Sequence, residues 1–421
     1  MKLSHYIYLY CMRATLSVLA VAAMASCVDD ESLCVEDRPG YTEGHDVWLA
    51  LSISNQGTAE SHSLSRASAT DDPSGHPDET ASAAENHIDK NDLTLMFLDE
   101  DTYCIKTLSP SDITLTAVNA DNGEYRVVTK INRSYFDFAG NSGNFYLLAI
   151  ANTRGINRSD LAADPVGNGT FMKSLREISD MLRAFSFDGL ISQDSASPWI
   201  PDIDGKRHIP MAGLQKMTVS KAQLDNASSP DNTIDLGEIS MQRAMAKIRI
   251  LDGIRFQDRL PSPTHIESVS FCSGTGKGAY MPSVSQCPTW AIGTATVETA
   301  TKPSPVGAWH NALLNIPTRQ HQFTNDADGK QYYAFSCYTP EAAVWDMRNS
   351  GTRPYLDIVT LSDDGERRNH TIYLDRVMPQ RDMARNHIYQ FTVTMSEQSV
   401  IELDYTVCEW NTVTSGDISF N

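Results

Sequence analysis

Apolar and polar residues alternate in many short segments along the chain. In residues 46–54, DVWLALSIS, the aliphatic side chains of Val47, Leu49, Leu51 and Ile53 occupy every second position. Successive side chains of a strand point to opposite faces of its sheet, so this pattern predicts a strand with one buried face. The segments LTLMFLDE and YRVVTKI predict further strands. NFYLLAIAN predicts a fully buried central strand because it is apolar almost throughout.

The second half of the chain continues the pattern. Strands are predicted for the segments MAKIRILDGI, IESVSFC, QYYAFSCY, YLDIVTLS, HTIYLD, IYQFTVTM and VIELDYTVCEW. Turn signals such as DADGK at residues 326–330 and SDDGE at residues 362–366 separate several of them. Many short strands with such turns indicate an all-β chain built of antiparallel β-sandwiches.

Two segments break this pattern. FMKSLREISDMLRAF places Leu175, Ile178, Leu182 and Phe185 at helical spacing, which predicts a minor helix over one edge of the first β domain. Residues 55–90 form a polar tract, rich in Ser, Ala, Asp, Glu, Pro and His, with very few large apolar residues. Such a tract cannot bury a core, so we expect it to be flexible.

Length and charge limit the possible organisation and partners. A chain of 421 residues suits two domains better than one, and we expect the boundary near residues 236–241. The chain carries 34 Lys and Arg against 53 Asp and Glu, a formal net charge of −19. This acidity argues against nucleic acid or an anionic membrane surface as the main partner.

The N-terminus has the pattern of an export signal. Lys2 and Arg13 supply positive charge, and an apolar stretch follows over residues 14–24. This stretch is too short for a spanning helix and fits a cleaved signal peptide, predicted over residues 1–26. Its end, LAVAAMASC, resembles a bacterial lipobox, in which a cysteine is lipidated and becomes the new N-terminus; here that residue is Cys27. Ordinary signal cleavage is the alternative.

The residues after the cysteine also resemble a sorting signal. VDDE at residues 28–31 resembles the acidic patch that sends Bacteroidota lipoproteins to the cell surface. No other segment has 18 uninterrupted apolar residues. We therefore expect the mature chain to be anchored to a membrane and not to span it.

No catalytic or metal-binding motif stands out. Apart from Cys11 and Cys27, six cysteines remain, and none lies at the spacing of a metal site. An exported protein can form disulfides, and Cys272 with Cys287 is the closest plausible pair; isolated half-buried thiols are the alternative. SGTGKGAY departs from the P-loop pattern, and no G-x-S-x-G motif occurs. We expect no enzymatic activity, no metal and no cofactor.

Several segments together resemble one protein family. DLGEISMQRAMAKIRI, FSCYTPEA, MARNHIYQFTVT and LDYTVCEW resemble segments of the Bacteroidales fimbrillins, the type V pilins, as do LTLMFLDE, FYLLAIAN and HIPMAG. The resemblance runs in order from the lipobox to the C-terminus. The start, CVDDESLCVEDRPGYTEGHDVWL, is less typical of shaft subunits, so shaft, tip and accessory roles all stay open.

The resemblance implies a fold. Fimbrillins have two transthyretin-like antiparallel β-sandwich domains in tandem, which here correspond to residues 67–238 and 239–421. The minor helix belongs to the first domain. Residues 27–66 correspond to a propeptide with a lipid anchor and a removable first strand.

The resemblance also implies a route of assembly. Fimbrillins reach the outer membrane as lipoproteins, and an arginine-specific surface protease cuts them and releases the first strand. Loss of this strand leaves a hydrophobic groove in the first domain. A C-terminal strand of another fimbrial subunit then fills that groove. The subunits polymerise in this way into an extracellular fimbrium that mediates adhesion.

Specific residues of this sequence match that route. The displaced strand has the inward-facing residues Val47, Leu49, Leu51 and Ile53. The cut is expected between Arg66 and Ala67, which follow this strand in the polar tract. Arg38 is a poorer candidate because it lies before the strand and precedes Pro39.

Two C-terminal segments are candidates for the donated strand. The first is VIELDYTV, with the apolar residues Ile401, Leu403, Tyr405 and Val407 at alternate positions. The second is NTVTSGDISFN at residues 411–421. The sequence leaves open which of the two is exchanged.

A surface glycan-binding lipoprotein of tandem β-sandwiches is the main alternative. It would need an exposed aromatic platform. The six tryptophans are scattered along the chain, at Trp48, Trp199, Trp290, Trp309, Trp345 and Trp410. A secreted hydrolase is the third interpretation, and no recognised site supports it.

Overall fold

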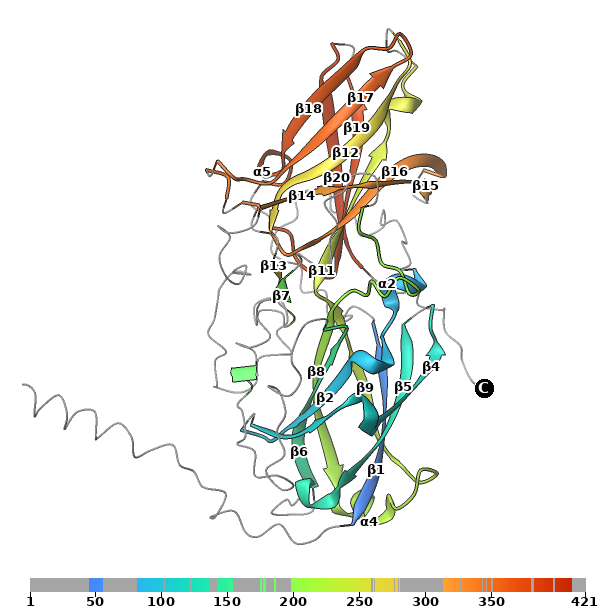
Figure 1. Ribbon diagram of the computed structural model, residues 1–421, viewed down its shortest axis with the longest axis vertical. Coiled ribbons are helices and arrows are strands. Elements are labelled where there is room, and N and C mark those ends of the chain that lie inside the picture. The colour runs from blue at the N-terminus through green and yellow to red at the C-terminus, as the bar shows by residue number, and fades with distance from the viewer. Residues whose placement is uncertain are drawn as a thin grey trace, which may run out of the picture. The chain divides into compact units, whose positions relative to one another are not determined.

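The computed structural model is built mostly of β-strands (Figure 1). It describes residues 45–55, 82–153 and 198–410, apart from gaps at residues 102, 122, 137–141, 259, 261, 276, 279, 281–312, 326–327, 343, 346, 350, 380–381 and 397, together with residues 175, 177, 178, 185 and 186. Within these ranges, no helix is long and apolar enough to cross a membrane.

Two sheets form the first β-sandwich. One has the strand order β4-β5-β1-β9 and the other has the order β10-β8-β6-β2-β3. The strands of the first sheet are β1 (Asp46–Ser54), β4 (Ile113–Asn119), β5 (Glu124–Asn132) and β9 (Ile234–Ser240). Those of the second are β2 (Leu93–Leu98), β3 (Cys104–Leu108), β6 (Ser142–Ala151), β8 (Met211–Ser220) and β10 (Gln242–Arg243).

Two further sheets form the second β-sandwich, with the strand orders β15-β16-β11-β19-β20 and β14-β12-β17-β18. The strands of the larger sheet are β11 (Met245–Asp252), β15 (Arg319–Asn325), β16 (Lys330–Pro340), β19 (His387–Met395) and β20 (Ile401–Glu409). Those of the smaller sheet are β12 (Thr264–Thr275), β14 (Leu313–Pro317), β17 (Tyr355–Ser362) and β18 (Arg367–Tyr373). A separate pair consists of β7 (Phe185–Ser186) and β13 (Lys277–Gly278).

The helical elements are short and lie between strands. The α-helices that lie wholly within the described residues are α2 (Ala83–Asn86), α4 (Lys221–Asn226) and α5 (Leu374–Val377). The 3-10 turns are η3 (Lys90–Asp92), η4 (Pro110–Asp112), η5 (Arg133–Phe136) and η7 (Ile254–Phe256). The prediction of a mostly β chain with β-sandwiches and little helix is thus confirmed.

The strands change from the first pair of sheets to the second at Ala244, between β10 and β11. This position lies close to the boundary expected from the sequence. One hydrophobic cluster nevertheless contains buried residues of all four sheets. The division into domains of residues 67–238 and 239–421 stays a prediction.

Each sandwich contains one parallel strand pair, which the expectation of antiparallel sandwiches did not include. β1 pairs antiparallel with β5 and parallel with β9. β11 pairs antiparallel with β16 and parallel with β19. Parallel neighbours cannot be joined by a tight hairpin, so these pairs join segments that are far apart in sequence. β1 and β11 each lie between an antiparallel and a parallel neighbour, so they occupy equivalent positions in their sheets.

The predicted minor helix is only partly right. Leu175 and Ile178 are helical and buried, as their spacing predicts. Phe185 instead begins β7, which pairs with β13 near the start of the second sandwich. This pairing with a distant strand overrides the helical spacing. Leu182 lies outside the described residues.

The expectation that the whole polar tract is flexible is wrong for its end. Residues 83–86 form α2, whose first turn is closed by reciprocal hydrogen bonds between Ser82 and Glu85. Glu85 and Asn86 are buried, and Ile88 joins the hydrophobic core. This part of the tract is held by partners that lie far away in the sequence.

The first prediction concerns the contribution of β1 to the first sandwich. Leu51→Ala should lower the stability of the sheet by about 2–5 kcal/mol, because Leu51 is 1% exposed and the truncation leaves a cavity. Amide hydrogen exchange of β5, the neighbouring strand, measures this loss. Ser52→Thr is the matched control, since Ser52 is exposed on the same strand. Equal exchange in both variants would show that β1 contributes little to the sheet.

Candidate functional site

β1 is an interior strand of its sheet, with hydrogen-bonded neighbours on both edges (Figure 1). Its antiparallel register with β5 runs from Asp46 opposite Asn132 to Ile53 opposite Tyr125. Its parallel register with β9 shifts between Ala50 and Ser52. A chain that lost β1 would leave unpaired N–H and C=O groups along both β5 and β9.

The side chains of β1 that the sequence pattern singled out all lie in the core. The four residues are at most 1% exposed: Val47, Leu49, Leu51 and Ile53. At about 1.5–3 kcal/mol for each buried aliphatic side chain, they contribute roughly 6–12 kcal/mol of apolar burial. A strand held in this way leaves its slot slowly unless another strand replaces it.

Both ends of β1 are tied by further hydrogen bonds. Near its start, the Trp48 amide donates to the Ala227 carbonyl at 3.0 Å. At its end, the Met241 amide donates to the Ser54 carbonyl at 2.7 Å. The side-chain amide of Asn55 then donates to the Asn86 carbonyl, also at 2.7 Å. The exit of β1 is thus fixed both to the β9–β10 connection and to α2.

A buried polar cluster lies beside this exit, and sequence reasoning missed it. We call it the Arg243 cluster; its members are Glu85, Asn86, Arg243, Lys247, Tyr338, Asn386 and Trp410. At one end, the Lys247 Nζ lies 2.9 Å from Glu85 Oε1, and the Tyr338 hydroxyl donates to the same oxygen at 2.5 Å. α2, β11 and β16 supply these three side chains.

The charges of this pair stabilise each other. Burial alone raises the pKa of Glu85, but the Lys247 ammonium and the hydrogen bonds from Tyr338 and Lys247 bring the pKa below its usual value. Burial likewise opposes the charge of Lys247, and Glu85 overcomes this and raises the pKa of the lysine. Both groups are therefore ionised at neutral pH.

Arg243 connects the remaining members. Its Nε donates to the Glu85 carbonyl at 3.2 Å, and its Nη2 donates to Asn86 Oδ1. Its Nη1 donates to Asn386 Oδ1 at 3.0 Å and to the Trp410 carbonyl at 2.8 Å. The guanidinium lies 4.9 Å from the centre of a Trp410 ring. Burial lowers the pKa of Arg243 to about 10, so the group keeps its charge at neutral pH.

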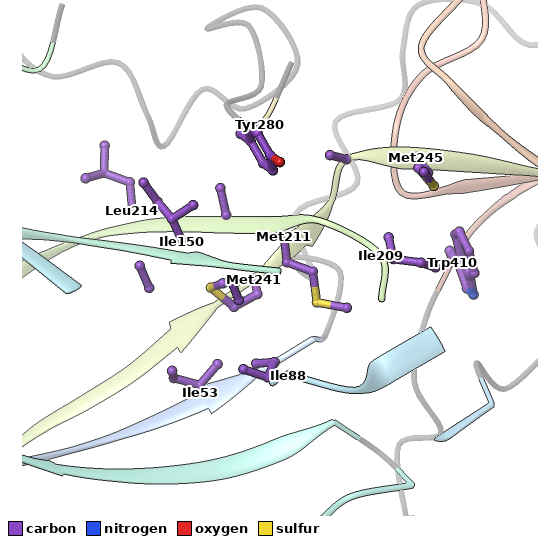
Figure 2. Close-up of a cluster of buried hydrophobic side chains, with 14 of the residues drawn as sticks. Ile53, Ile88, Ile150, Ile209, Met211, Leu214, Met241, Met245, Tyr280 and Trp410 are labelled. Atoms are coloured by element: carbon purple, nitrogen blue, oxygen red, sulfur yellow. The ribbon is translucent and has the colours of Figure 1, made fainter. Parts of the chain in front are cut away.

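Apolar side chains surround this cluster. Figure 2 shows part of the core from Ile53 and Ile88 through Met211 and Met241 to Trp410. All of these side chains are at most 2% exposed. Such surroundings exclude the water that would compete for a hydrogen bond. A buried polar group that loses its partner there stays unpaired, which costs free energy.

The candidate donor residues lie on β20. Ile401, Leu403, Tyr405 and Val407 are half-buried and pack against the main hydrophobic cluster. Glu402 and Asp404, between them, are exposed. Among the described strands, β20 pairs with β19 alone, which places it at the edge of its sheet. The other candidate segment, residues 411–421, lies outside the described residues.

The proposed processing residues are not part of the described structure. Cys27, Arg66 and Ala67 all lie outside it, as does the predicted signal peptide of residues 1–26. Cys272 and Cys337 carry free thiols. Cys287 lies outside the described ranges. Among the residues that are described, no cluster of His, Cys, Asp or Glu could hold a metal ion.

The tryptophans within the described ranges do not form an exposed platform. Trp199 and Trp410 are 4% and 0% exposed, and Trp48 is half-buried on β1. The guanidinium of Arg348 covers the ring of Trp345 at 4.4 Å. Trp290 and Trp309 lie outside these ranges.

One sequence signal could have revealed part of the Arg243 cluster. In the segment QRAMAKIRI, Lys247 lies in a strand whose other residues are mostly apolar, and Arg243 lies just before this strand. This strand is β11, and every residue of it is buried. Charged residues in a buried strand need partners. Nothing in the polar tract identified Glu85 as the partner, because Glu85 lies 162 residues from Lys247.

No protein-family model and no curated protein sequence matches the chain. One similar solved structure is the tip fimbrial protein Mfa3 from Porphyromonas gingivalis with C-terminal truncation, at 12% sequence identity and a TM-score of 0.46. That match covers 87% of this chain and 100% of the other. Another is a fimbrial assembly protein from Parabacteroides distasonis, at 11% identity and a TM-score of 0.43, covering 86% of this chain and 99% of that one.

Both matches span most of this chain, and both have TM-scores below 0.5. Neither of these proteins carries the name of an enzyme. At such identities the likeness is one of fold and assigns no role to this chain.

The second prediction tests the buried ion pair. Glu85→Gln should destabilise the protein by about 3–5 kcal/mol, because it leaves the Lys247 ammonium buried without its counter-charge. Urea unfolding measures the change. Lys247→Met in the same chain should recover part of the loss by removing the unpaired charge. Glu366→Gln is the control, since Glu366 pairs with Arg368 on the surface and its loss should change little.

The third prediction follows from the lowered pKa of Glu85. A carboxyl with a lowered folded-state pKa stabilises the protein fully above its usual value of 4.5, and this contribution disappears as the pH falls further. The difference in unfolding free energy between the wild type and Glu85→Gln should therefore shrink as the pH falls below 4.5. A difference that does not vary with acidity would mean that Glu85 is not ionised in the folded chain.

Proposed function

We propose that this chain is a structural subunit of a surface fimbria, assembled by protease-triggered strand exchange, and that it mediates adhesion. The observation that carries the proposal is the position of β1. β1 is an interior strand with four buried aliphatic side chains, and it precedes the segment that contains Arg66. A single cut in that segment separates the strand from the sandwich that it completes.

The precursor follows from the sequence signals. Residues 1–26 act as the signal peptide and Cys27 carries the lipid that anchors the chain to the outer membrane. Residues 27–66 are the propeptide, followed by two transthyretin-like domains over residues 67–238 and 239–421. An arginine-specific surface protease cuts between Arg66 and Ala67.

Loss of β1 creates the binding site for another subunit. β5 and β9 then present open edges, and the core between them is exposed. An extended strand from a neighbouring subunit restores both hydrogen-bond ladders and the apolar contacts. Contacts of this head-to-tail type do not close on themselves, so they produce a filament.

β20 has the features of a donated strand. Its apolar residues alternate over four positions, as those of β1 do. It also pairs on one edge only, so its release breaks one hydrogen-bond ladder where release of β1 breaks two. Residues 411–421 stay the second candidate.

The observations favour this function over glycan binding. A glycan-binding surface of this kind uses exposed aromatic rings, and the described tryptophans are buried, half-buried or covered by arginine. An adhesive role does not need such a platform, because the polymer itself extends from the cell.

The fourth prediction tests the processing step. Assembled fibres should contain chains that begin at Ala67, as read by mass spectrometry of the mature N-terminus. Arg66→Ala should keep the chain as a lipid-anchored monomer, without the multimer ladder of the wild type on a mildly heated gel. Arg38→Ala is the matched control and should polymerise normally. Fibres whose chains begin at Cys27, or normal polymerisation of Arg66→Ala, would rule out the proposed cut.

A further inference from the structure

The exit of β1 is connected to Arg243 by two routes. The backbone route is the hydrogen bond from the Met241 amide to the Ser54 carbonyl, two residues before Arg243 in the chain. The side-chain route runs from Asn55 to the carbonyl of Asn86, whose own Oδ1 accepts from Arg243. Both routes depend on β1 being in its slot.

Arg243 is also connected to the exit of β20. Trp410 directly follows this strand, and its carbonyl accepts from the Arg243 Nη1 at 2.8 Å. The Trp410 ring lies against the same guanidinium, and the Trp410 amide donates to the Asn386 carbonyl at 2.8 Å. Asn386 is held in turn by Arg243 through its Oδ1.

We propose that Arg243 couples the two strands, so that removal of β1 loosens the docking of β20 in its own sandwich. The inference rests on the proposed function, in which β1 is released and β20 is donated. The inference adds that the release of β1 and the release of β20 are linked.

The burial of the cluster makes this coupling effective. Arg243 and Trp410 are both 0% exposed while β1 is in place, so in the uncut chain no water competes for their hydrogen bonds. When β1 leaves, the Asn86 carbonyl loses Asn55 and the chain before Arg243 loses Ser54. Asn86 then holds the guanidinium less firmly, and the contact between Arg243 and the Trp410 carbonyl weakens with it.

The coupling is reciprocal, as any linkage between two sites must be. While β1 is in place, Arg243 keeps β20 docked, so an unprocessed precursor does not offer its C-terminal strand. Once β1 has left its slot, the same residue restrains β20 less. The subunit thus becomes an acceptor and a donor together.

Hydrogen exchange of the uncut, full-length chain tests the coupling. The readout is the exchange of the peptide that covers β20 and Trp410, with β17 as the internal reference. Asn55→Ala breaks the side-chain route and should speed exchange in β20 by about 5- to 100-fold, the range typical of coupled sites. Asn132→Ala is the matched control.

The control removes a similar set of hydrogen bonds at the other end of the ladder. Asn132 lies opposite Asp46, and its Oδ1 accepts from the amide and the hydroxyl of Ser134 at 2.9 and 2.6 Å. Asn132→Ala should therefore leave β20 unchanged, since Asn132 lies opposite the start of β1, at the other end of the strand from Ser54.

A double variant shows whether the effect passes through Arg243. Arg243→Gln should speed exchange in β20 by itself, and Asn55→Ala should then add less than about a twofold further change. If the two effects multiply in the double variant, or if Asn55→Ala leaves β20 unaffected, the proposal is wrong. Should β17 also exchange rapidly in Arg243→Gln, Arg243→Lys takes its place under the same criteria.

This test does not depend on polymerisation. If the coupling is observed but the Arg66→Ala variant still polymerises, the inference stands and the proposed cut is wrong. If the chain polymerises as proposed but shows no coupling, the proposed function stands and the role inferred for Arg243 is wrong.

Discussion

The first sandwich depends on an interior strand supplied by the N-terminal end of the chain. β1 holds β5 and β9 together through hydrogen-bond ladders on both of its edges. Without it, the order β4-β5-β1-β9 divides into a hairpin and an isolated strand. Both the cohesion of the sheet and the contacts of four core aliphatics therefore depend on a segment that precedes a long polar tract. In the proposed assembly, this placement lets a single cut separate the strand from its sheet.

The second sandwich places its own first strand in the same position but secures it differently. β11 lies between β16 and β19, as β1 lies between β5 and β9. β11 continues directly from β10, which belongs to the first sandwich, so neither of its ends is loose. The second sheet also has β20 beyond β19, where the first sheet ends at β9. The strand proposed to leave is thus an interior strand in the first sandwich and an edge strand in the second.

The Arg243 cluster lies between the ends of β1 and β20, and burying its charged side chains costs desolvation free energy. Glu85, Lys247 and Arg243 are all buried, and hydrophobic side chains of similar shape could stabilise the same space equally well. Charged groups differ from apolar ones in that they tolerate few alternative arrangements, because each lost partner leaves an unpaired charge. The rings of Trp410 and Tyr338 complete the surroundings of the cations, with Lys247 Nζ 5.8 and 5.9 Å from their centres.

The sequence by itself determined the strands and their buried faces, because alternation is a local property that a strand of any sheet must satisfy. Val47 to Ile53 were identified in this way as a buried face, and Ile401 to Val407 as an apolar face that the structure leaves half-buried. The tertiary structure alone decided that β1 is interior and β20 is at an edge, since alternation is the same in both. It also decided that Phe185 belongs to a strand and that Glu85 is buried. Each of these outcomes depends on a partner far along the chain, and no local pattern records the position of such a partner.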